Sequence, residues 1–167
     1  MNLDFGKNKT FAILKSLIEN FKDLQIIAIA GKNIKIKKQF EELVTESGST
    51  ENVKVLEYTN KVPELMSVSD LVITKPGGLT TTESLASGLP IIVINPIPGQ
   101  EEDNARFLEK NDVAIWIKED DDVKTSLEKI FNDREKLLKM KINARLLAKK
   151  NSTMDICEIL LNFSSSL

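Results

Sequence analysis

Residues 70–94 read DLVITKPGGLTTTESLASGLPIIVI, and this stretch decides the fold class of the chain. Residues 70–74 and 91–94 are short apolar runs rich in valine and isoleucine, which predicts two buried strands. The segment between them predicts a helix from about Thr80 to Ser87 that ends at Gly88. A strand, a helix and a second strand in this order predict a βαβ unit, in which the two strands run parallel.

The same alternation of strands and helices continues on both sides of this unit. Further strands are predicted at residues 25–30, 53–58 and 113–117. Further helices are predicted at residues 11–21, 34–44 and 62–68, after Gly99 to about Lys110, and two or three times within 123–163, with a break near 150–153. We therefore predict one α/β domain over residues 1–167, with a doubly wound, Rossmann-like parallel sheet.

The composition excludes several classes of protein. The chain is 41% hydrophobic and 29% charged, which argues against disordered and disulfide-rich proteins. It contains no histidine, which excludes Ser-His-Asp catalysis and histidine metal sites within this chain. Cys157 is the one cysteine, so the chain forms no internal disulfide and a reducing compartment is predicted. Its apolar neighbours Ile156 and Ile159 predict that Cys157 lies in the core.

The charges are unevenly distributed along the chain. Residues 41–133 carry 8 basic and 19 acidic side chains, which argues against a nucleic-acid groove, so no nucleic-acid partner is expected. Residues 134–150 carry 7 basic side chains and one acidic one. This basic stretch has two interpretations, a helix on anionic lipid or the solvated outer face of a helix. No apolar run approaches the roughly 20 residues that a membrane-spanning helix needs.

Ligands of doubly wound sheets bind beyond the carboxyl ends of the strands, which directs attention to four loops. These loops follow Ala30, Tyr58, Thr74 and Ile94. The first contains Gly31 and Lys32 but lacks the other residues of a P-loop.

The loop after Thr74 has the composition of a phosphate-binding turn. Pro76 fixes one backbone angle, and Gly77 and Gly78 allow a ligand to approach the backbone closely. A helix follows, whose free amides and positive dipole end attract phosphate. The alternative is an ordinary turn before a helix.

Thr80 and Glu83 also have two interpretations. Their spacing fits a capping box, in which Thr80 caps the helix and Glu83 binds the amide of Thr80. The other interpretation makes Glu83 a ligand of ribose hydroxyls, because a carboxylate shortly after a phosphate loop is within reach of a nucleoside.

The loop after Ile94 and the helix that follows read NPIPGQEEDN at residues 95–104. Gln100 and Asn104 are four residues apart, so they share one helix face, where paired amides suit sugar hydroxyls. The alternative is a run of acids, Glu101, Glu102 and Asp103, that complements the helix dipole. Asp120 and Asp122 have the spacing of a metal pair, but a four-residue acidic run before a helix predicts a solvated cap.

Residues 69–109 as a whole resemble the carboxy-terminal, donor-binding half of glycosyltransferase family 28. The resemblance rests on KPGGLT at residues 75–80 followed by PIPGQEEDN at 96–104. This pair of motifs is similar to the branch of the family that contains the monogalactosyldiacylglycerol synthases and the processive diacylglycerol glucosyltransferases. Weaker similarity covers residues 25–148.

The resemblance implies one half of a GT-B enzyme, in which two Rossmann-like domains face each other across a cleft. It implies a UDP-sugar, UDP-glucose or UDP-galactose, as donor substrate, with no cofactor and no metal. Glu83 would bind the ribose, which favours the second interpretation of this residue over the capping box, and Tyr58 and Thr59 would meet the uracil. The diphosphate would lie among Gly77, Gly78, Leu79 and Thr80, and the donor sugar at the loop of Pro98, Gly99, Gln100, Glu101 and Asn104.

The family inverts at the anomeric carbon, and this branch of it transfers a hexose to diacylglycerol, so the resemblance implies a bacterial glycolipid enzyme that is peripheral on the inner face of the cell membrane. Its amino-terminal acceptor domain, which supplies the catalytic base, is absent from residues 1–167, and so is a glycine-rich loop. Only residues 4–8 stand before the first predicted helix, with no strand ahead of it. We therefore expect no catalytic residue in this chain and no turnover by this domain alone.

Two other hypotheses stay open at this point. The first hypothesis is the donor domain just described. The second is a stand-alone UDP-GlcNAc-binding subunit of a split family 28 transferase that needs a membrane partner. An enzyme similar to UDP-GlcNAc 2-epimerase is the third hypothesis, against which the short chain and the lack of histidine count.

Overall fold

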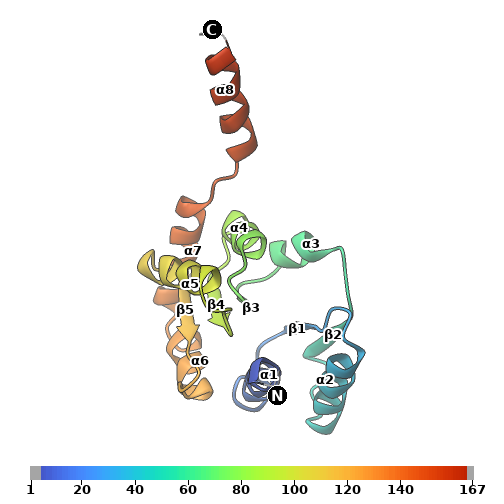
Figure 1. Cartoon of the computed structure of the whole chain (residues 1–167). Coiled ribbons are helices and arrows are strands. Elements are labelled where there is room, and N and C mark those ends of the chain that lie inside the picture. Colours follow the sequence, from blue (N-terminus) through green and yellow to red (C-terminus); the bar gives the residue numbers. More distant parts are fainter. Residues whose placement is uncertain (1–4, 165–167) are drawn as a thin grey trace.

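The computed structural model describes residues 5–164, which form an α/β domain of alternating helices and strands (Figure 1). The strands are β1 (Ile26–Ile29), β2 (Val53–Leu56), β3 (Val72–Thr74), β4 (Ile91–Ile94) and β5 (Ala114–Ile117). The helices are α1 (Phe5–Asn20), α2 (Ile34–Glu46), α3 (Val62–Ser67), α4 (Gly78–Ala86), α5 (Gln100–Lys110), α6 (Val123–Phe131), α7 (Arg134–Leu147) and α8 (Ser152–Ser164).

All strand pairs among the described residues are parallel, as predicted, but the strands form two sheets. β1 pairs with β2, and β3, β4 and β5 form a second sheet in that order. Parallel neighbours need crossover connections, and helices supply them. The predicted α/β fold with parallel strands is confirmed, and its division into two hydrogen-bonded sheets is a finding of the structure.

β4 is the central strand of the three-stranded sheet. Its four residues, IIVI, are between 0% and 5% exposed, because helices cover both faces. Val93 packs on one face with side chains of α4, α5 and α7, including Leu85, Leu108 and Ala144. Ile92 packs on the other face with side chains of α1 and α6. An uninterrupted apolar strand therefore reflects burial on both sides.

α1 packs across both sheets. Ile13 and Leu17 contact the core over β4 and β5, whereas Leu14 and Ile18 belong to a second core with α2 and β2. The prediction that residues 5–8 precede the first helix is wrong, since α1 begins at Phe5, and Asp4 lies outside the described residues. The hydrophobic spacing starts only at Phe11, so periodicity alone could not locate the helix start.

The basic helix α7 buries one side and exposes its charges. Met140 and Ala144 are buried, and Lys139 and Lys141 pair with Asp112 and Asp70. This arrangement favours the interpretation of residues 134–150 as a solvated outer face.

α8 extends away from the body of the domain (Figure 1). The prediction that Cys157 lies in the core is wrong: the residue is exposed, like its neighbours Ile156, Ile159 and Leu160. No helix within residues 5–164 combines the length and the apolar character needed to cross a bilayer.

Candidate functional site

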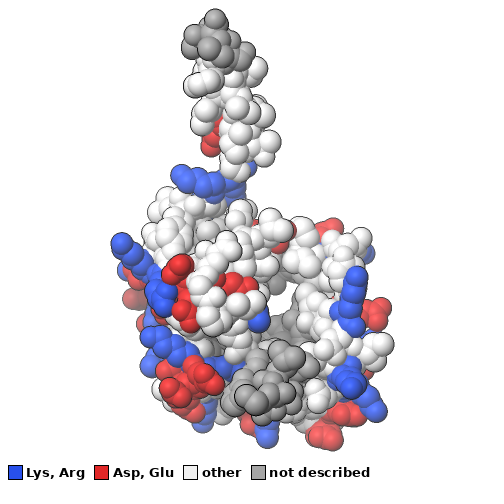
Figure 2. Space-filling model, viewed as in Figure 1, with Lys and Arg blue, Asp and Glu red and all other residues white. Residues whose placement is uncertain are grey.

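The four loops singled out in the sequence follow the carboxyl ends of β1, β2, β3 and β4. Because β3 and β4 are hydrogen-bonded neighbours, the loops after them, residues 75–77 and 95–99, leave the same edge of the sheet. In the space-filling view the surface is hollowed between the part of the molecule built on β3, β4 and β5 and the part built on β1 and β2 (Figure 2). The candidate site is the group formed by these loops and by the starts of the helices that follow them.

α4 begins directly after the loop at residues 75–77. Gly77 is the N-cap, with φ −66° and ψ 149°, and Gly78 is the first helical residue. The predicted start at Thr80 is therefore wrong, because glycines that look like a turn in the sequence already belong to the cap and the helix. The first helical backbone bond runs from the amide of Thr81 to the carbonyl of Gly77, at 2.9 Å. The amides of Gly78, Leu79 and Thr80 precede this bond.

The capping box is also wrong. Thr80 is the third residue of α4, and its carbonyl accepts a hydrogen bond from the hydroxyl of Ser84 at 2.7 Å. A glycine N-cap has no side chain that could occupy the first amides of the helix, and none of these amides receives a side-chain cap. The start of α4 therefore offers several N–H groups and a positive dipole end to an anion.

Glu83 lies one turn further along α4. Its side chain is exposed, and within the described part of the chain it forms no ion pair or hydrogen bond. Leu79, 84% exposed, is four residues earlier, so Leu79 and Glu83 share one solvent-facing side of the helix. The carboxylate is thus unengaged and belongs to the helix turn that follows the first amides.

α5 ties the two loops together. The side-chain amide of Asn104 donates to the carbonyl of Pro76 at 2.9 Å, and Pro76 itself is fully buried. The carboxylate of Glu101 accepts from the amide of Ile97 at 2.7 Å. A Cβ on Gly77 would lie 3.9 Å from Glu101 Oε1, so the loops at residues 75–77 and 95–99 are in contact through α5.

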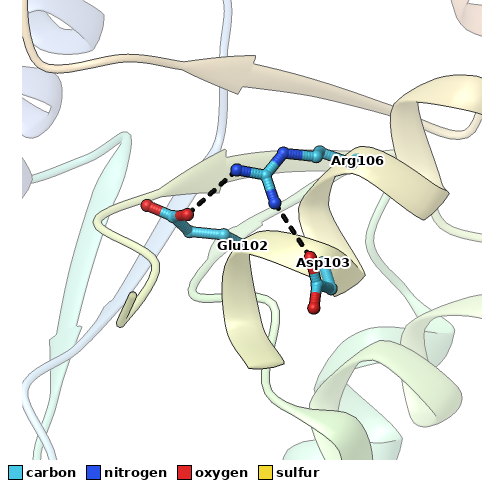
Figure 3. A network of polar contacts seen from close by, with 3 residues as sticks. All are labelled: Glu102, Asp103 and Arg106. Atoms are coloured by element: carbon cyan, nitrogen blue, oxygen red, sulfur yellow. Dashed lines mark hydrogen bonds and ion pairs between the residues drawn. The ribbon is translucent and has the colours of Figure 1, made fainter. Parts of the chain in front are cut away.

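The three acidic side chains at the start of α5 have different partners. Glu102 and Asp103 form ion pairs with Arg106 of the same helix, at 3.0 and 2.8 Å (Figure 3). Glu101 instead holds the preceding loop, through Ile97. The interpretation of the acidic run as a solvated, dipole-complementing turn therefore fits Glu102 and Asp103.

Gly99 shapes the turn into α5. Its backbone has φ 95° and ψ −120°, a conformation that L side chains rarely adopt. Pro98, Gly99 and Gln100 are all exposed, so this turn presents backbone and an amide side chain to the solvent at the sheet edge.

Tyr58 and Thr59 follow β2, in the other sheet. Tyr58 is 62% exposed, and the ammonium group of Lys32 lies 5.2 Å from the centre of its ring. The hydroxyl of Thr59 accepts from the amide of Lys61 at 3.1 Å, which closes a turn. Lys32 also lines a hollow with Ala30, Asn33, Ile34 and Lys35.

The structure therefore brings the predicted site residues together in two groups. One contains the start of α4 and the start of α5, and the other contains Tyr58 and Thr59. Within residues 5–164 no hydrogen bond or ion pair joins the two groups. Two features were not predicted from the sequence. One is the position of Lys32 beside Tyr58. The other is the hydroxyl of Thr81, which is buried and lacks a hydrogen-bond partner in the described structure.

Asp122, by contrast, has the predicted role of a cap. Its carboxylate accepts from the amide of Thr125 at 2.8 Å at the start of α6. Hydrogen bonds from the side chain and the backbone of Thr125 lower the pKa of the Asp122 carboxyl below its ordinary value. Among the described residues no group of three or more acidic or cysteine side chains is placed to hold a metal ion.

The family of the chain follows from a direct comparison. Residues 8–158 match the family model of the glycosyltransferase family 28 C-terminal domain. The chain belongs to glycosyltransferase family 28. The match covers both groups of candidate site residues, so the family assignment and the site concern the same domain.

The relatives of this family 28 domain include proteins named processive diacylglycerol beta-glucosyltransferase. It is 37% identical over 165 residues to the processive diacylglycerol beta-glucosyltransferase of Bacillus subtilis (strain 168), covering 97% of this chain and 43% of that protein. It is 40% identical over 136 residues to the enzyme of the same name from Bacillus pumilus (strain SAFR-032), covering 81% and 35%. The chain thus spans less than half the length of these relatives.

Solved structures of glycosyltransferases share the fold. Anabaena HepE in complex with UDP matches all of this chain and 47% of its own, with a TM-score of 0.68 at 19% identity. WaaG, a glycosyltransferase involved in lipopolysaccharide biosynthesis, matches with a TM-score of 0.66 at 22% identity, over 88% of this chain and 40% of its own. The predicted fold class, a Rossmann-like half of a GT-B glycosyltransferase, is confirmed.

Gly78, the first residue of α4, allows a test of whether a ligand approaches the backbone of this family 28 domain closely. A Cβ built on Gly78 meets no atom within 4 Å, and its φ is not in the left-handed region. Since alanine is also the better helix former, Gly78→Ala is expected to leave the free energy of unfolding unchanged or to raise it slightly. If a diphosphate contacts this backbone, the added methyl group weakens UDP binding by roughly tenfold.

Urea unfolding and calorimetric titration measure the two effects of Gly78→Ala separately. Gly48→Ala provides the contrast, because Gly48 has φ 66° and lies after α2, so it is expected to lose stability without a specific effect on binding. Unchanged UDP affinity in Gly78→Ala would contradict a close contact between the diphosphate and the backbone at this position.

Proposed function

We propose that this domain binds the UDP-sugar donor, UDP-glucose or UDP-galactose, of an inverting glycosyltransferase that transfers a hexose to diacylglycerol in glycolipid synthesis. The observation that carries the proposal is the glycine-capped start of α4, with its unoccupied amides one helical turn from the unpaired carboxylate of Glu83. The names of the relatives support the substrate class.

The diphosphate binds at the start of α4. The amides of Gly78, Leu79 and Thr80 donate to phosphate oxygens, and Gly77 leaves room for them because it has no side chain. When the bond to the sugar breaks, negative charge grows on the leaving UDP. Fixed amides and the helix dipole stabilise this charge, and we propose that they do so without a metal or another cofactor.

The nucleoside and the sugar occupy the two sides of this phosphate site. Glu83 accepts hydrogen bonds from the ribose hydroxyls, and Tyr58 and Thr59 meet the uracil. The donor sugar binds at the loop and helix start of Pro98, Gly99, Gln100, Glu101 and Asn104. In this arrangement Asn104 also has a structural role, because one of its two amide hydrogens is already bound to Pro76.

The partner of this domain is an acceptor domain on its amino-terminal side. The family model is a C-terminal domain, and the relatives are more than twice as long as the matched part. That acceptor domain supplies the base that activates the acceptor hydroxyl, and this domain alone is expected not to turn over. The complete enzyme works as a peripheral protein on the inner face of the cell membrane, where diacylglycerol and anionic lipid are its partners.

Calorimetric titration with UDP, with ADP as the control, tests this proposal. We expect UDP to bind at least about tenfold more tightly than ADP, because base contacts add to the shared diphosphate contacts. Equal affinities would show an anion site without a uridine preference. Circular dichroism of the same sample shows that the chain is folded, so lack of binding by a folded chain would contradict the proposal.

A further inference from the structure

α7 carries apolar side chains on two opposite sides. On the inner side Met140 and Ala144 are buried, and Leu137 and Leu147 pack against the two cores beneath them. These four positions are three or four residues apart, so they form one face of the helix. One such face is what a helix on the surface of a globular domain needs for its attachment, and the inner side provides it.

A second line of apolar side chains, the outer stripe, consists of Leu138, Ile142 and Leu146. They are 59%, 49% and 78% exposed, and each lies four residues from the next, so they follow one side of the helix. Ile142 is about 200° around the helix from Met140, so the outer stripe points away from the core. Figure 1 shows α7 on the side of the domain opposite to β1 and β2. Aligned aliphatic side chains in solvent are typical of an interaction surface.

Positive charge accompanies the outer stripe. Residues 134–150 carry 7 basic side chains and one acidic one. Lys139 and Lys141 form ion pairs with acidic residues outside α7. Within the described part of the chain the other basic side chains of this stretch form no ion pair: Arg134, Lys136, Arg145, Lys149 and Lys150. Arg145 is three residues after Ile142 and therefore lies beside the outer stripe. The outer face of α7, which is solvated in the free domain, thus combines an apolar line with uncompensated positive charge.

The charge distinguishes between two kinds of partner for this face. In a two-fold dimer the outer stripe would lie on the same stripe of a second copy, so the unpaired cations of both chains would face each other and repel. A bilayer that contains anionic lipid provides negative headgroups for the cations and acyl chains for the outer stripe. An apolar helix face flanked by lysine and arginine is the pattern of helices that lie in the plane of such a surface.

We propose that the outer stripe of α7 and the cations beside it dock this domain on an anionic membrane surface, with the helix axis parallel to the membrane plane. The stripe enters the boundary between headgroups and acyl chains, and the cations bind lipid phosphates. This inference assigns a surface to the peripheral location proposed above and rests on that location. It does not rest on the nucleotide, because α7 contributes no residue to the loops of the candidate site.

Sedimentation of the 167-residue chain with lipid vesicles tests the proposal. The probe is a vesicle of phosphatidylglycerol and phosphatidylcholine in equal amounts, and a vesicle of pure phosphatidylcholine is the comparison. We expect binding to the anionic vesicle to be at least about tenfold tighter, and to weaken when salt screens the charges. Equal binding to both vesicles, or binding to neither, would overturn the proposal.

The variant Leu138→Gln/Ile142→Gln/Leu146→Gln removes the outer stripe and keeps every charge. Glutamine is a good helix former and the three positions are exposed, so the melting temperature is expected to stay close to that of the wild type. We expect this variant to bind the anionic vesicle at least about tenfold more weakly than the wild type, because the apolar contact is lost.

A matched variant on α8, Ile156→Gln/Leu160→Gln/Phe163→Gln, also removes three exposed apolar side chains. It is expected to bind the anionic vesicle within about twofold of the wild type. A loss as large as that of the α7 variant would overturn the proposal. Sedimentation velocity without vesicles gives a further test: self-association that the α7 variant abolishes would also overturn it, because a second copy would then cover the outer stripe.

A pair of charge variants tests the cations without changing the outer stripe. Lys149→Gln/Lys150→Gln is expected to weaken binding to the anionic vesicle by at least about threefold. Lys35→Gln/Lys54→Gln removes the same charge from α2 and β2 and is expected to bind like the wild type. An equal loss in the two variants would show attraction by net charge alone and would contradict the assigned surface.

Titration of the same variants with UDP keeps this inference apart from the donor site. Normal UDP affinity without vesicle binding would contradict the membrane surface alone. Vesicle binding without UDP binding would contradict the donor site alone.

Discussion

Replacing Glu83 by alanine is expected to weaken UDP binding by roughly a hundredfold, which corresponds to about 3 kcal/mol. The carboxylate is exposed and unpaired in the described structure, so its removal breaks no internal contact. Hydrogen bonds from two ribose hydroxyls to one charged group account for an effect of this size. Calorimetric titration of the wild-type and variant chains measures it directly.

Two controls separate the ribose contact from a general effect on α4. Thr82→Ala changes the adjacent exposed residue, whose hydroxyl donates to the carbonyl of Gly78, and is expected to bind UDP like the wild type. The second control is the ligand 2′-deoxy-UDP, which lacks one partner of the carboxylate. It should bind the wild type more weakly than UDP does, but bind Glu83→Ala about as well as UDP. If the affinity for 2′-deoxy-UDP were a full hundredfold lower in Glu83→Ala than in the wild type, the assigned contact would be contradicted.

Asn104→Ala is expected to weaken UDP binding by roughly thirtyfold and to lower the free energy of unfolding by about 1–2 kcal/mol. The reason is the 2.9 Å hydrogen bond from its amide to the carbonyl of buried Pro76, which fixes the loop before α4. Without it the carbonyl loses its partner and the first amides of α4 lose their fixed direction.

Asn111→Ala is the matched control for this variant. Asn111 is at the other end of α5, and its amide donates to the carbonyl of Phe107 at 2.8 Å. It removes the same chemical group at a distance from the loop, so it is expected to affect stability slightly and UDP binding not at all. Asn104→Ala with normal UDP affinity would show that the loop keeps its geometry without α5.

Much of the fold could be predicted from the sequence because burial and hydrophobic pattern agree. Residues 91–94 form β4 as predicted, since a run of four β-branched residues in an α/β protein is typical of a parallel strand that is buried on both faces. α2 ends close to the predicted residue, because Gly48 follows it with a φ of 66°.

The parts that could not be predicted depend on contacts between distant residues. The start of α4 at Gly78 is not visible in a Lys-Pro-Gly-Gly sequence, which is equally typical of a free turn. The bond from Asn104 to Pro76 joins residues 28 positions apart, and no local pattern encodes it. Cys157 has the apolar neighbours of a core residue, but α8 extends away from the core.

The measurement that tests the central claim most directly is the map of backbone amide shifts on titration of the 15N-labelled chain with UDP. We expect saturable shifts at Gly78, Leu79 and Thr80, with a second group at Tyr58 and Thr59, and much smaller shifts on the distant helix α6. ADP should move the first group alone, because the diphosphate is shared and the base is not. Saturable binding of UDP that leaves the amides of Gly78 to Thr80 unmoved would contradict the account.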